Sequence, residues 1–261
     1  MNILNFARKK TQGEKITMIT CYDYSSARLV ADLPVDCLLV GDSAAMTMHG
    51  HKDTVPATLE MMEFHTRAVS RGAADKFIIG DLPFLSYRKS FDSVMDSVQR
   101  LIQAGAHAVK LEGADGNLKL IQHLVESGIP VMGHIGLTIQ MIHQLGGFKV
   151  QGKTEEGAER LKQQAKNLQE AGCFAVVLEC MPKLVAKEIT QALTIPTIGI
   201  GAGADTDGQV LVWHDLLGLN LDFKPKFVET FVNGQELVKD GVNRFIQAVA
   251  SGEFPRDEHC Y

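Results

Sequence analysis

Eight short apolar segments recur along the chain with helical segments between them, and this alternation constrains the fold more than any other feature. Each segment has the length and unbroken apolar character of a buried parallel strand. Strands that alternate with helices form a parallel sheet covered by helices. In chain order the predicted strands are ITMITCY from Ile16, CLLVGDS from Cys37, FIIGDLP from Phe77, AVKLEG from Ala108, VMGHIG from Val131, AVVLEC from Ala175, TIGIGAG from Thr197 and QVLVWHD from Gln209.

The clearest helical segment lies between Ser90 and Gly105. Ser90 is of a type that caps helix N-termini, and Gly105 suits the C′ position, where the backbone turns left-handed. Two later helices are predicted to end in the same way, at Gly128 and Gly172. The apolar residues of the first helix recur on one face, at Phe91, Val94, Met95, Val98, Leu101 and Ile102.

An internal repeat supports two successive copies of one strand unit. AGAHAVKLEG from Ala104 aligns with AGCFAVVLEC from Ala171. At nearly the same offset, IPVMG from Ile129 aligns with IPTIG from Ile195. Self-similarity of this kind is typical of a fold built from repeated units.

A length of 261 residues suits one α/β barrel and leaves little for a second domain. The same elements could form an open doubly wound sheet, but eight strands favour closure. We therefore predict a single (β/α)8 TIM barrel domain over residues 1–261, with a helical C-terminal tail. The segment from Leu216 to Phe223 is apolar without a clear period. From Lys224 we expect a loop, and then a helix from Gly234 to Val249.

Charge and cysteine content narrow the class of protein. The formal net charge is -5, with the two signs interspersed, which indicates no basic face for nucleic acid and favours a small-molecule partner. The chain has no signal-like start and no apolar run long enough to span a membrane, so we expect a cytoplasmic protein. The five cysteines are odd in number and lack a CxxC, so we interpret them as structural thiols: Cys21, Cys37, Cys173, Cys180 and Cys260.

Polar residues stand at or near the C-terminal ends of five predicted strands, which meet at one mouth in a barrel. Four are acids, and in one concavity these would repel each other and take up protons unless a cation neutralised them. Carboxylate oxygens suit Mg²⁺ or Mn²⁺. The pattern favours a divalent metal site, although any one acid could instead cap a helix or pair with a loop. The residues are Asp42 and Ser43, Asp81, Lys110 with Glu112, His134, and Glu179.

Lys110 is informative because it lies between Val109 and Leu111 in an apolar strand. Side chains alternate along a strand, so Lys110 and Glu112 point to the same side. A charged lysine there would be costly unless it faced a polar site. We expect both to face the barrel interior near its open end.

Two weaker motifs admit a structural interpretation. His49 and His51 form an HxH that could bind zinc, but no third ligand follows at a suitable spacing, so a polar loop is favoured. GIGAG from Gly199 is similar to a phosphate-binding turn, yet its glycines equally suit close backbone packing.

Several long sequence motifs, from about Ile16 to the C-terminus, resemble those of the ketopantoate hydroxymethyltransferase family. They are TCYDYSSA from Thr20, LLVGDS from Leu38, MTMHGH from Met46, DLPF from Asp81, VKLEGA from Val109, GHIGLT from Gly133, GGFKVQG from Gly146, VLEC from Val177 and IGIGAGADTDGQVLVWHD from Ile198. The resemblance implies a (β/α)8 barrel of the phosphoenolpyruvate/pyruvate type. It also implies a homo-oligomer, expected to be a decamer.

The resemblance implies a role for each strand-end residue. Asp42 and Asp81 would bind Mg²⁺, with Glu112 a further acid that reaches the metal through water. The position of Glu179 matches the one proposed as the proton acceptor in the family. The substrate-binding set would be Asp42, Ser43, Asp81, Lys110 and His134.

The implied reaction transfers a hydroxymethyl group from the co-substrate 5,10-methylenetetrahydrofolate to 3-methyl-2-oxobutanoate. The products are 2-dehydropantoate and tetrahydrofolate, in pantothenate biosynthesis, and the route is a metal-stabilised enolate. Two alternatives remain at this point: a metal-dependent 2-oxo acid lyase of the phosphoenolpyruvate/pyruvate barrel group, and a non-catalytic metabolite-binding barrel.

Overall fold

The computed structural model describes residues 1–221 and 225–261, and the chain divides into two compact units, residues 1–212 and 213–261. The first unit contains a closed barrel of eight parallel strands, each paired with its neighbours in sequence order. Strand β8 pairs with β1 and closes the barrel, with Met18 opposite Val210. The strands are β1 (Ile16–Thr20), β2 (Cys37–Val40), β3 (Phe77–Asp81), β4 (Ala108–Lys110), β5 (Val131–Gly136), β6 (Ala175–Glu179), β7 (Thr197–Ile200) and β8 (Gly208–Leu211).

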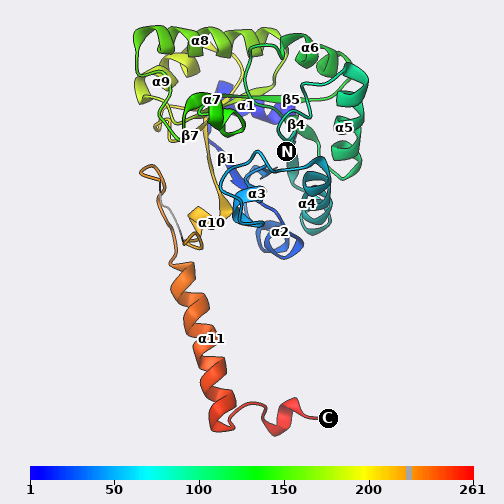
Figure 1. The fold of residues 1–261 in the computed structure, drawn as a ribbon, viewed down its shortest axis with the longest axis vertical. Helices are drawn as coiled ribbons and strands as arrows, with labels where there is room; N and C mark the ends of the chain where they lie inside the picture. The colour runs from blue at the N-terminus through cyan, green and yellow to red at the C-terminus, as the bar shows by residue number, and fades with distance from the viewer. Residues whose placement is uncertain (222–224) are drawn as a thin grey trace. The chain divides into compact units, whose positions relative to one another are not determined.

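All eight predicted strands are confirmed, and closure excludes the open sheet. Helices follow the strands and cover the outside of the barrel (Figure 1). The helical elements of this unit are α1 (Ile3–Gln12), α2 (Tyr24–Val30), α3 (Ala44–Thr47), α4 (Leu59–Gly72), α5 (Phe91–Gln103), α6 (Leu118–Glu126), η1 (Ile139–Met141), α7 (Ile142–Leu145), α8 (Glu155–Glu170) and α9 (Lys183–Ala192).

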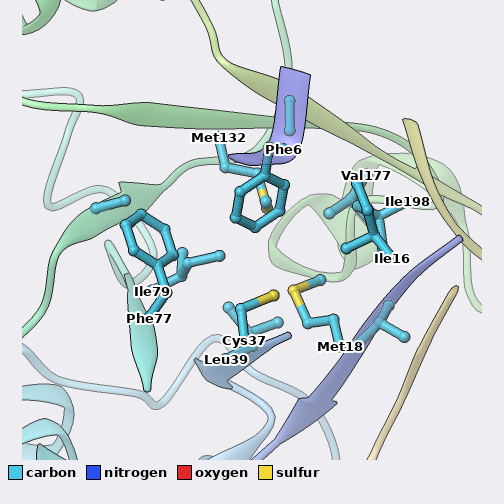
Figure 2. Close-up of a cluster of buried hydrophobic side chains, with 13 residues drawn as sticks. Phe6, Ile16, Met18, Cys37, Leu39, Phe77, Ile79, Met132, Val177 and Ile198 are labelled. Carbon is cyan, nitrogen blue, oxygen red and sulfur yellow. The ribbon is translucent and has the colours of Figure 1, made fainter. Parts of the chain in front are cut away.

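The barrel interior is filled by apolar side chains from alternate positions of the strands (Figure 2). Helix α1 adds Phe6, which is fully buried and meets Phe77 and Phe174 edge-on at ring distances of 5.6 and 5.2 Å. The aromatic cluster therefore fills one end of the barrel with apolar side chains. The buried members are Phe6, Ile16, Met18, Cys37, Leu39, Phe77, Ile79, Ala108, Met132, Ala175, Val177, Ile198 and Val210.

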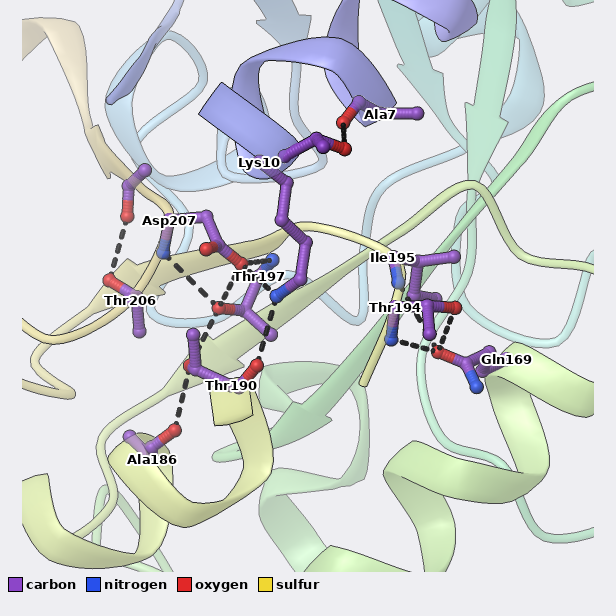
Figure 3. A network of polar contacts seen from close by, with 12 residues as sticks. Ala7, Lys10, Gln169, Ala186, Thr190, Thr194, Ile195, Thr197, Thr206 and Asp207 are labelled. Atoms are coloured by element: carbon purple, nitrogen blue, oxygen red, sulfur yellow. Dashed lines mark hydrogen bonds and ion pairs between the residues drawn. The ribbon is translucent and has the colours of Figure 1, made fainter. Parts of the chain in front are cut away.

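A polar network next to this aromatic cluster holds α1 against the strands (Figure 3). The Lys10 ammonium lies 2.7 Å from Asp207 Oδ2 and donates to the Thr190 carbonyl oxygen at 2.9 Å. The same Asp207 oxygen accepts from the Thr197 backbone N–H at 2.8 Å. Because Thr197 begins β7 and Asp207 precedes β8, α1 is tied to the N-terminal ends of the strands. The opposite, C-terminal ends are thus left to form a site.

The predicted helix ends are confirmed in the backbone, with one correction. Gly105, Gly128 and Gly172 all have positive φ, at 110°, 85° and 99°. Ser90 does occupy the N-cap position of α5, but its side chain makes no capping hydrogen bond. Residue type predicts the position of a cap, whereas the hydrogen bond also needs a side-chain rotamer aimed at the helix, which Ser90 lacks.

The C-terminal unit contains α10 (Trp213–Leu216), α11 (Gly234–Ser251) and η2 (Asp257–His259). The helix predicted from Gly234 to Val249 is confirmed and runs two residues further. Its N-cap is Asn233, whose side chain accepts from the Glu236 N–H. Asp222, Phe223 and Lys224 lie outside the described residues, so the predictions for that part of the tail are not addressed by the structure.

None of the helices in residues 1–221 and 225–261 combines the length and the apolar character required to cross a bilayer.

Candidate active site

The strand-end residues predicted from the sequence form one connected set of contacts at the C-terminal ends of β2 to β6. Asp81, Lys110 and Glu179 are the last residues of their strands, and His134 lies within β5. Asp42 follows β2 by two residues and is almost fully buried. The structure therefore brings together chemistry-bearing side chains from five adjacent strands.

Asp42 and Asp81 form the acidic centre of the site. The Asp42 backbone N–H donates to Asp81 Oδ2 at 3.0 Å, which fixes the two residues against each other. Burial, together with the nearby charges of Asp81 and Glu112, raises the pKa of Asp42 to about 8. With all its acids ionised, the site would therefore hold more negative than positive charge.

Lys110 supplies part of the positive charge. Its ammonium lies 3.1 Å from Asp81 Oδ1, and the Lys110 side chain is only 5% exposed. Burial lowers the pKa of Lys110, but attraction to Asp81, Glu112 and Asp42 outweighs it and moves the pKa above its usual value. Lys110 stays charged at neutral pH, and the prediction that it faces a polar site inside the barrel is confirmed.

His134 lies between two carboxylates. Its Nδ1 is 3.2 Å from Glu112 Oε1, and its Nε2 is 3.1 Å from Glu179 Oε2. Both are ion-pair contacts too poorly aligned to count as hydrogen bonds. Burial and the charge of Lys110 lower the pKa of His134, but the carboxylates outweigh them and raise it to about 9. The imidazole is therefore a buried cation at neutral pH.

Ser43 meets a residue that the sequence analysis missed. Its hydroxyl lies 2.7 Å from the hydroxyl of Tyr22, which is fully buried two residues after β1. Tyr22 could have been found, because it too follows the C-terminal end of a strand. Its backbone oxygen contacts His65 Nδ1 at 2.6 Å, and His65 Nε2 lies 2.9 Å from His49 Nε2.

The glycines of GIGAG are closely packed. A Cβ on Gly199 would lie 2.7 Å from the Thr206 hydroxyl, and one on Gly203 would lie 2.7 Å from the Cβ of Lys183. Close backbone packing is the interpretation supported by these distances.

Gln140, in η1, is a second residue missed from the sequence. Its side-chain amide donates to Asp42 Oδ2 at 2.7 Å, and its backbone N–H donates to Glu112 Oε2 at 3.0 Å. The Tyr87 hydroxyl donates to Gln140 Oε1 at 2.7 Å. Neither Gln140 nor Tyr87 stands at a strand end, and no local pattern marks them.

The backbone around Glu179 is tightly constrained. Gly136, at the end of β5, has φ 99°, and a Cβ there would lie 2.0 Å from the Glu179 carbonyl oxygen. That oxygen accepts from the Leu137 N–H at 2.9 Å. The next residue, Cys180, has φ 46°, a left-handed conformation that side chains other than glycine rarely adopt. The position of Glu179 is thus set by close contact on both sides.

The chemistry of the donor set suits a divalent cation bound by few protein ligands. Within the part of the chain that the structure describes, no three His, Cys, Asp or Glu side chains are grouped so as to hold a metal ion alone. Mg²⁺ usually binds through one or two carboxylates, with water and substrate oxygens completing its coordination. Asp42 and Asp81 fit this need, since they are buried like charges and Asp81 Oδ1 has no aligned hydrogen bond.

The cysteines are consistent with structural thiols. Cys21, Cys37, Cys173 and Cys180 are buried, and Cys260 is exposed. Burial raises the pKa of Cys21 to about 12 and acts in the same direction on the other three. These buried side chains are poor nucleophiles at neutral pH.

Comparison with known proteins assigns the family. The family model described as ketopantoate hydroxymethyltransferase matches residues 1–257. The chain belongs to the ketopantoate hydroxymethyltransferase family. This confirms the resemblance found in the sequence.

Relatives named 3-methyl-2-oxobutanoate hydroxymethyltransferase match over essentially their whole length. The protein of Bdellovibrio bacteriovorus is 58% identical over 259 residues, which cover 99% of this chain and 98% of the relative. That of Legionella pneumophila is 56% identical over 262 residues and covers all of both chains. That of Francisella tularensis subsp. tularensis is 54% identical over 260 residues, covering 100% of this chain and 98% of the relative.

Solved structures with the same fold are distant in sequence. A putative phosphonomutase from Burkholderia cenocepacia J2315 has a TM-score of 0.65 at 15% identity, over 84% of this chain and 95% of that chain. A 2,3-dimethylmalate lyase, described as a member of the PEP mutase/isocitrate lyase superfamily, has a TM-score of 0.61 at 16% identity, over 99% and 91%. At such identities the likeness shows the fold alone, and it agrees with the (β/α)8 barrel.

Membership in the ketopantoate hydroxymethyltransferase family favours the transferase over both alternatives. A non-catalytic barrel would have no use for the buried acids and the buried Lys110.

Proposed function

We propose that the chain transfers a hydroxymethyl group from 5,10-methylenetetrahydrofolate to 3-methyl-2-oxobutanoate. With one water, the reaction gives 2-dehydropantoate and tetrahydrofolate, in pantothenate biosynthesis. The observation that carries the proposal is the family match over residues 1–257, in a chain whose predicted acids lie together at the barrel mouth. We expect the protein to work in the cytoplasm.

The proposed metal site consists of Asp42 and Asp81, with Glu112 reaching the ion through water. When bound, Mg²⁺ would act as a Lewis acid on the keto oxygen of the substrate and make the proton on C3 more acidic. The excess negative charge around Asp42 supports this assignment, since it is the charge that a cation would neutralise.

Lys110 is proposed to bind the substrate and to stabilise charge that develops on its oxygen. The ammonium is held in place by Asp81 before any substrate arrives, so no reorganisation is needed during the reaction. Ser43, fixed by Tyr22, is proposed to donate a hydrogen bond to the substrate carboxylate.

Glu179 is the proposed base that takes the proton from C3. Its side chain is 13% exposed, the most accessible of the acids in ion-pair contact here, as access to a substrate requires. His134, a cation at neutral pH, contacts one carboxylate oxygen and so limits the orientation of the Glu179 side chain. The enolate carbon then forms a bond to the one-carbon unit supplied by the folate. Both C–N bonds of that carbon break to release tetrahydrofolate, and the water provides the oxygen of the new hydroxyl group.

A homo-oligomer, expected to be a decamer, is also proposed. Helix α11 supports it, because apolar residues recur along this helix at helical spacing and would suit packing on another subunit. These are Leu237, Val238, Val242, Phe245, Ile246 and Val249. Light scattering of the purified protein would give the subunit number.

One assay tests the function directly. Purified protein is mixed with 3-methyl-2-oxobutanoate, 5,10-methylenetetrahydrofolate and Mg²⁺, and the products are identified by mass spectrometry. We expect 2-dehydropantoate and tetrahydrofolate in equal amounts. If this mixture gives no product but a larger 2-oxo acid is cleaved in a parallel assay, the lyase is favoured. Binding of the substrates without turnover would favour the non-catalytic barrel.

A further inference from the structure

Gln140 contacts two of the three acids proposed for the metal site. It lies in η1 and not at a strand end, so the pattern that predicted the acids does not include it. Its Nε2 donates to Asp42 Oδ2 at 2.7 Å and its backbone N–H donates to Glu112 Oε2 at 3.0 Å. The residue is 2% exposed, so water cannot replace these contacts without a rearrangement of the loop. One residue therefore links Asp42 after β2 with Glu112 after β4.

The orientation of the Gln140 amide is fully determined by its neighbours. The second Nε2 hydrogen goes to the Leu82 carbonyl oxygen at 3.0 Å. On the other side, Oε1 accepts from the Tyr87 hydroxyl at 2.7 Å. A flipped amide would place Oε1 against a carboxylate and a carbonyl, with no donor between them. The Asp42 carboxylate and the Leu82 carbonyl, both acceptors, thus select the orientation in which Nε2 faces Asp42. Tyr87, itself 5% exposed, holds the other end of the amide in place through Oε1.

We propose that Gln140 is a positioning residue for the metal site, with its amide held in place by hydrogen bonds to the Leu82 carbonyl and from Tyr87. The amide would fix the carboxylate of Asp42 through Oδ2, and the backbone N–H would fix the carboxylate of Glu112 through Oε2, so that both acids are oriented before a cation binds. The proposal rests on the proposed function, because it concerns the metal of that site.

The chemical type of residue 140 supports this role. A glutamine donates hydrogen bonds without adding positive charge, whereas a lysine or arginine at this place would compete with the cation for the acids. The positive charges already present, Lys110 and His134, contact Asp81, Glu112 and Glu179. Asp42 accepts a hydrogen bond from a neutral amide instead, which leaves its negative charge available to attract a cation.

The test is the affinity for Mn²⁺, measured by electron paramagnetic resonance with 3-methyl-2-oxobutanoate present and no folate. Gln140→Met keeps the side-chain length and the backbone N–H but removes the amide. We expect it to bind Mn²⁺ about 10 to 100-fold more weakly, as is typical when a partner of a metal ligand is lost. Tyr87→Phe should weaken binding by a smaller factor, since the amide keeps its contact with Asp42 but loses the hydrogen bond that holds Oε1 in place.

A double variant distinguishes positioning from general loosening of the loop. If Tyr87 acts through Gln140, Tyr87→Phe has no further effect on Mn²⁺ affinity once Gln140 is Met. The matched control is Ser86→Ala, which removes a buried hydrogen bond in the same loop, from Ser86 Oγ to the Pro83 oxygen at 2.7 Å. This control should lower the melting temperature and leave Mn²⁺ affinity unchanged.

The outcomes separate this proposal from the proposed function. Wild-type Mn²⁺ affinity in both single variants would overturn the role of Gln140 while leaving the metal site intact. Failure of the wild-type protein itself to bind Mn²⁺ would instead remove the metal from the proposed function, and the positioning role with it. If Gln140→Met does not fold, Tyr87→Phe decides: a weaker Mn²⁺ affinity at an unchanged melting temperature supports the proposal, and an unchanged affinity overturns it.

Discussion

Glu112 and Glu179 contact opposite nitrogens of one buried imidazole, that of His134. The two glutamates occupy equivalent positions in the internal repeat, AGAHAVKLEG and AGCFAVVLEC. The backbone follows the same repeat, since the next residues, Gly113 and Cys180, both have positive φ, at 80° and 46°. The repeated strand end thus places two acids on either side of β5. In the proposed function, one of them serves the metal and the other the proton transfer.

Glu179→Gln should stop proton removal while substrate still binds. The amide has the size of the carboxylate but cannot accept a proton, so we expect exchange of the C3 proton for deuterium to fall by at least about 100-fold. Proton NMR of 3-methyl-2-oxobutanoate in D2O, with Mg²⁺ and without folate, measures this. The control is Glu126→Gln, an exposed residue at the end of α6, which should exchange at the wild-type rate. An undiminished rate in Glu179→Gln would assign the base elsewhere.

Removal of the metal should abolish the same exchange. EDTA is expected to reduce C3 exchange to the rate without enzyme, and added Mg²⁺ is expected to restore it, because the keto oxygen is no longer polarised without the cation. Full exchange by metal-free protein would contradict the proposed role of the metal.

Asp42→Asn should separate the effect of Asp42 on the stability of the metal-free protein from its role in binding Mg²⁺. The ionised carboxylate is disfavoured by burial and by its neighbours Asp81 and Glu112, so the neutral amide should leave the metal-free protein as stable as the wild type or more so. Mg²⁺ should raise the melting temperature of the wild type, since a ligand at 100 times its Kd adds about 2.7 kcal/mol. It should do so much less in Asp42→Asn, and differential scanning fluorimetry would show an equal rise if Asp42 were not a ligand.

The strand-end residues could be predicted because their chemistry conflicts with their surroundings. A lysine at position 110, between Val109 and Leu111, has to face a polar partner, and the structure supplies Asp81. The eight strands were predictable for a related reason, since unbroken apolar runs of this length are stable only when buried on both faces.

The residues that escaped prediction act through contacts set by loop conformation. Gln140 reaches Asp42 only because η1 folds back over the strand ends. The sequence of this segment has no periodic pattern from which that conformation could be predicted. His49 illustrates the same limit, because its close partner is His65, 16 residues away, rather than His51 of the HxH motif. Side-chain rotamers at such places depend on the assembled barrel.

Gly136→Ala should damage the site through the backbone of Glu179. A methyl group there would lie 2.0 Å from the Glu179 carbonyl oxygen, so β5 and β6 would have to move apart. The control is Gly128→Ala, which also has positive φ but meets nothing within 4 Å. We expect Gly128→Ala to lose about 1 kcal/mol from backbone strain alone. Gly136→Ala should lose several times more and should also reduce C3 exchange; equal losses in urea unfolding would show that the contact does not matter.

Stability should fall as the pH drops below neutrality, in part because of His65. Burial lowers the pKa of His65, and the neighbouring His49 lowers it further, while the Tyr22 oxygen and Asp23 act in the opposite direction. Because the unfolded chain takes up a proton at about pH 6.5 and the folded chain only at lower pH, the contribution is present above pH 6.5 and is lost as the pH falls toward the folded pKa.

The test compares urea unfolding of the wild type and His65→Asn between pH 7.5 and 5. Asparagine can still donate to the Tyr22 oxygen, as His65 Nδ1 is placed to do, but it does not titrate. The variant should lose less stability over this range, with each unit of lowered pKa worth about 1.4 kcal/mol. His143→Asn, which removes an exposed histidine in α7, is the control for general loss of an imidazole. Parallel curves for the wild type and His65→Asn would exclude the contribution of His65.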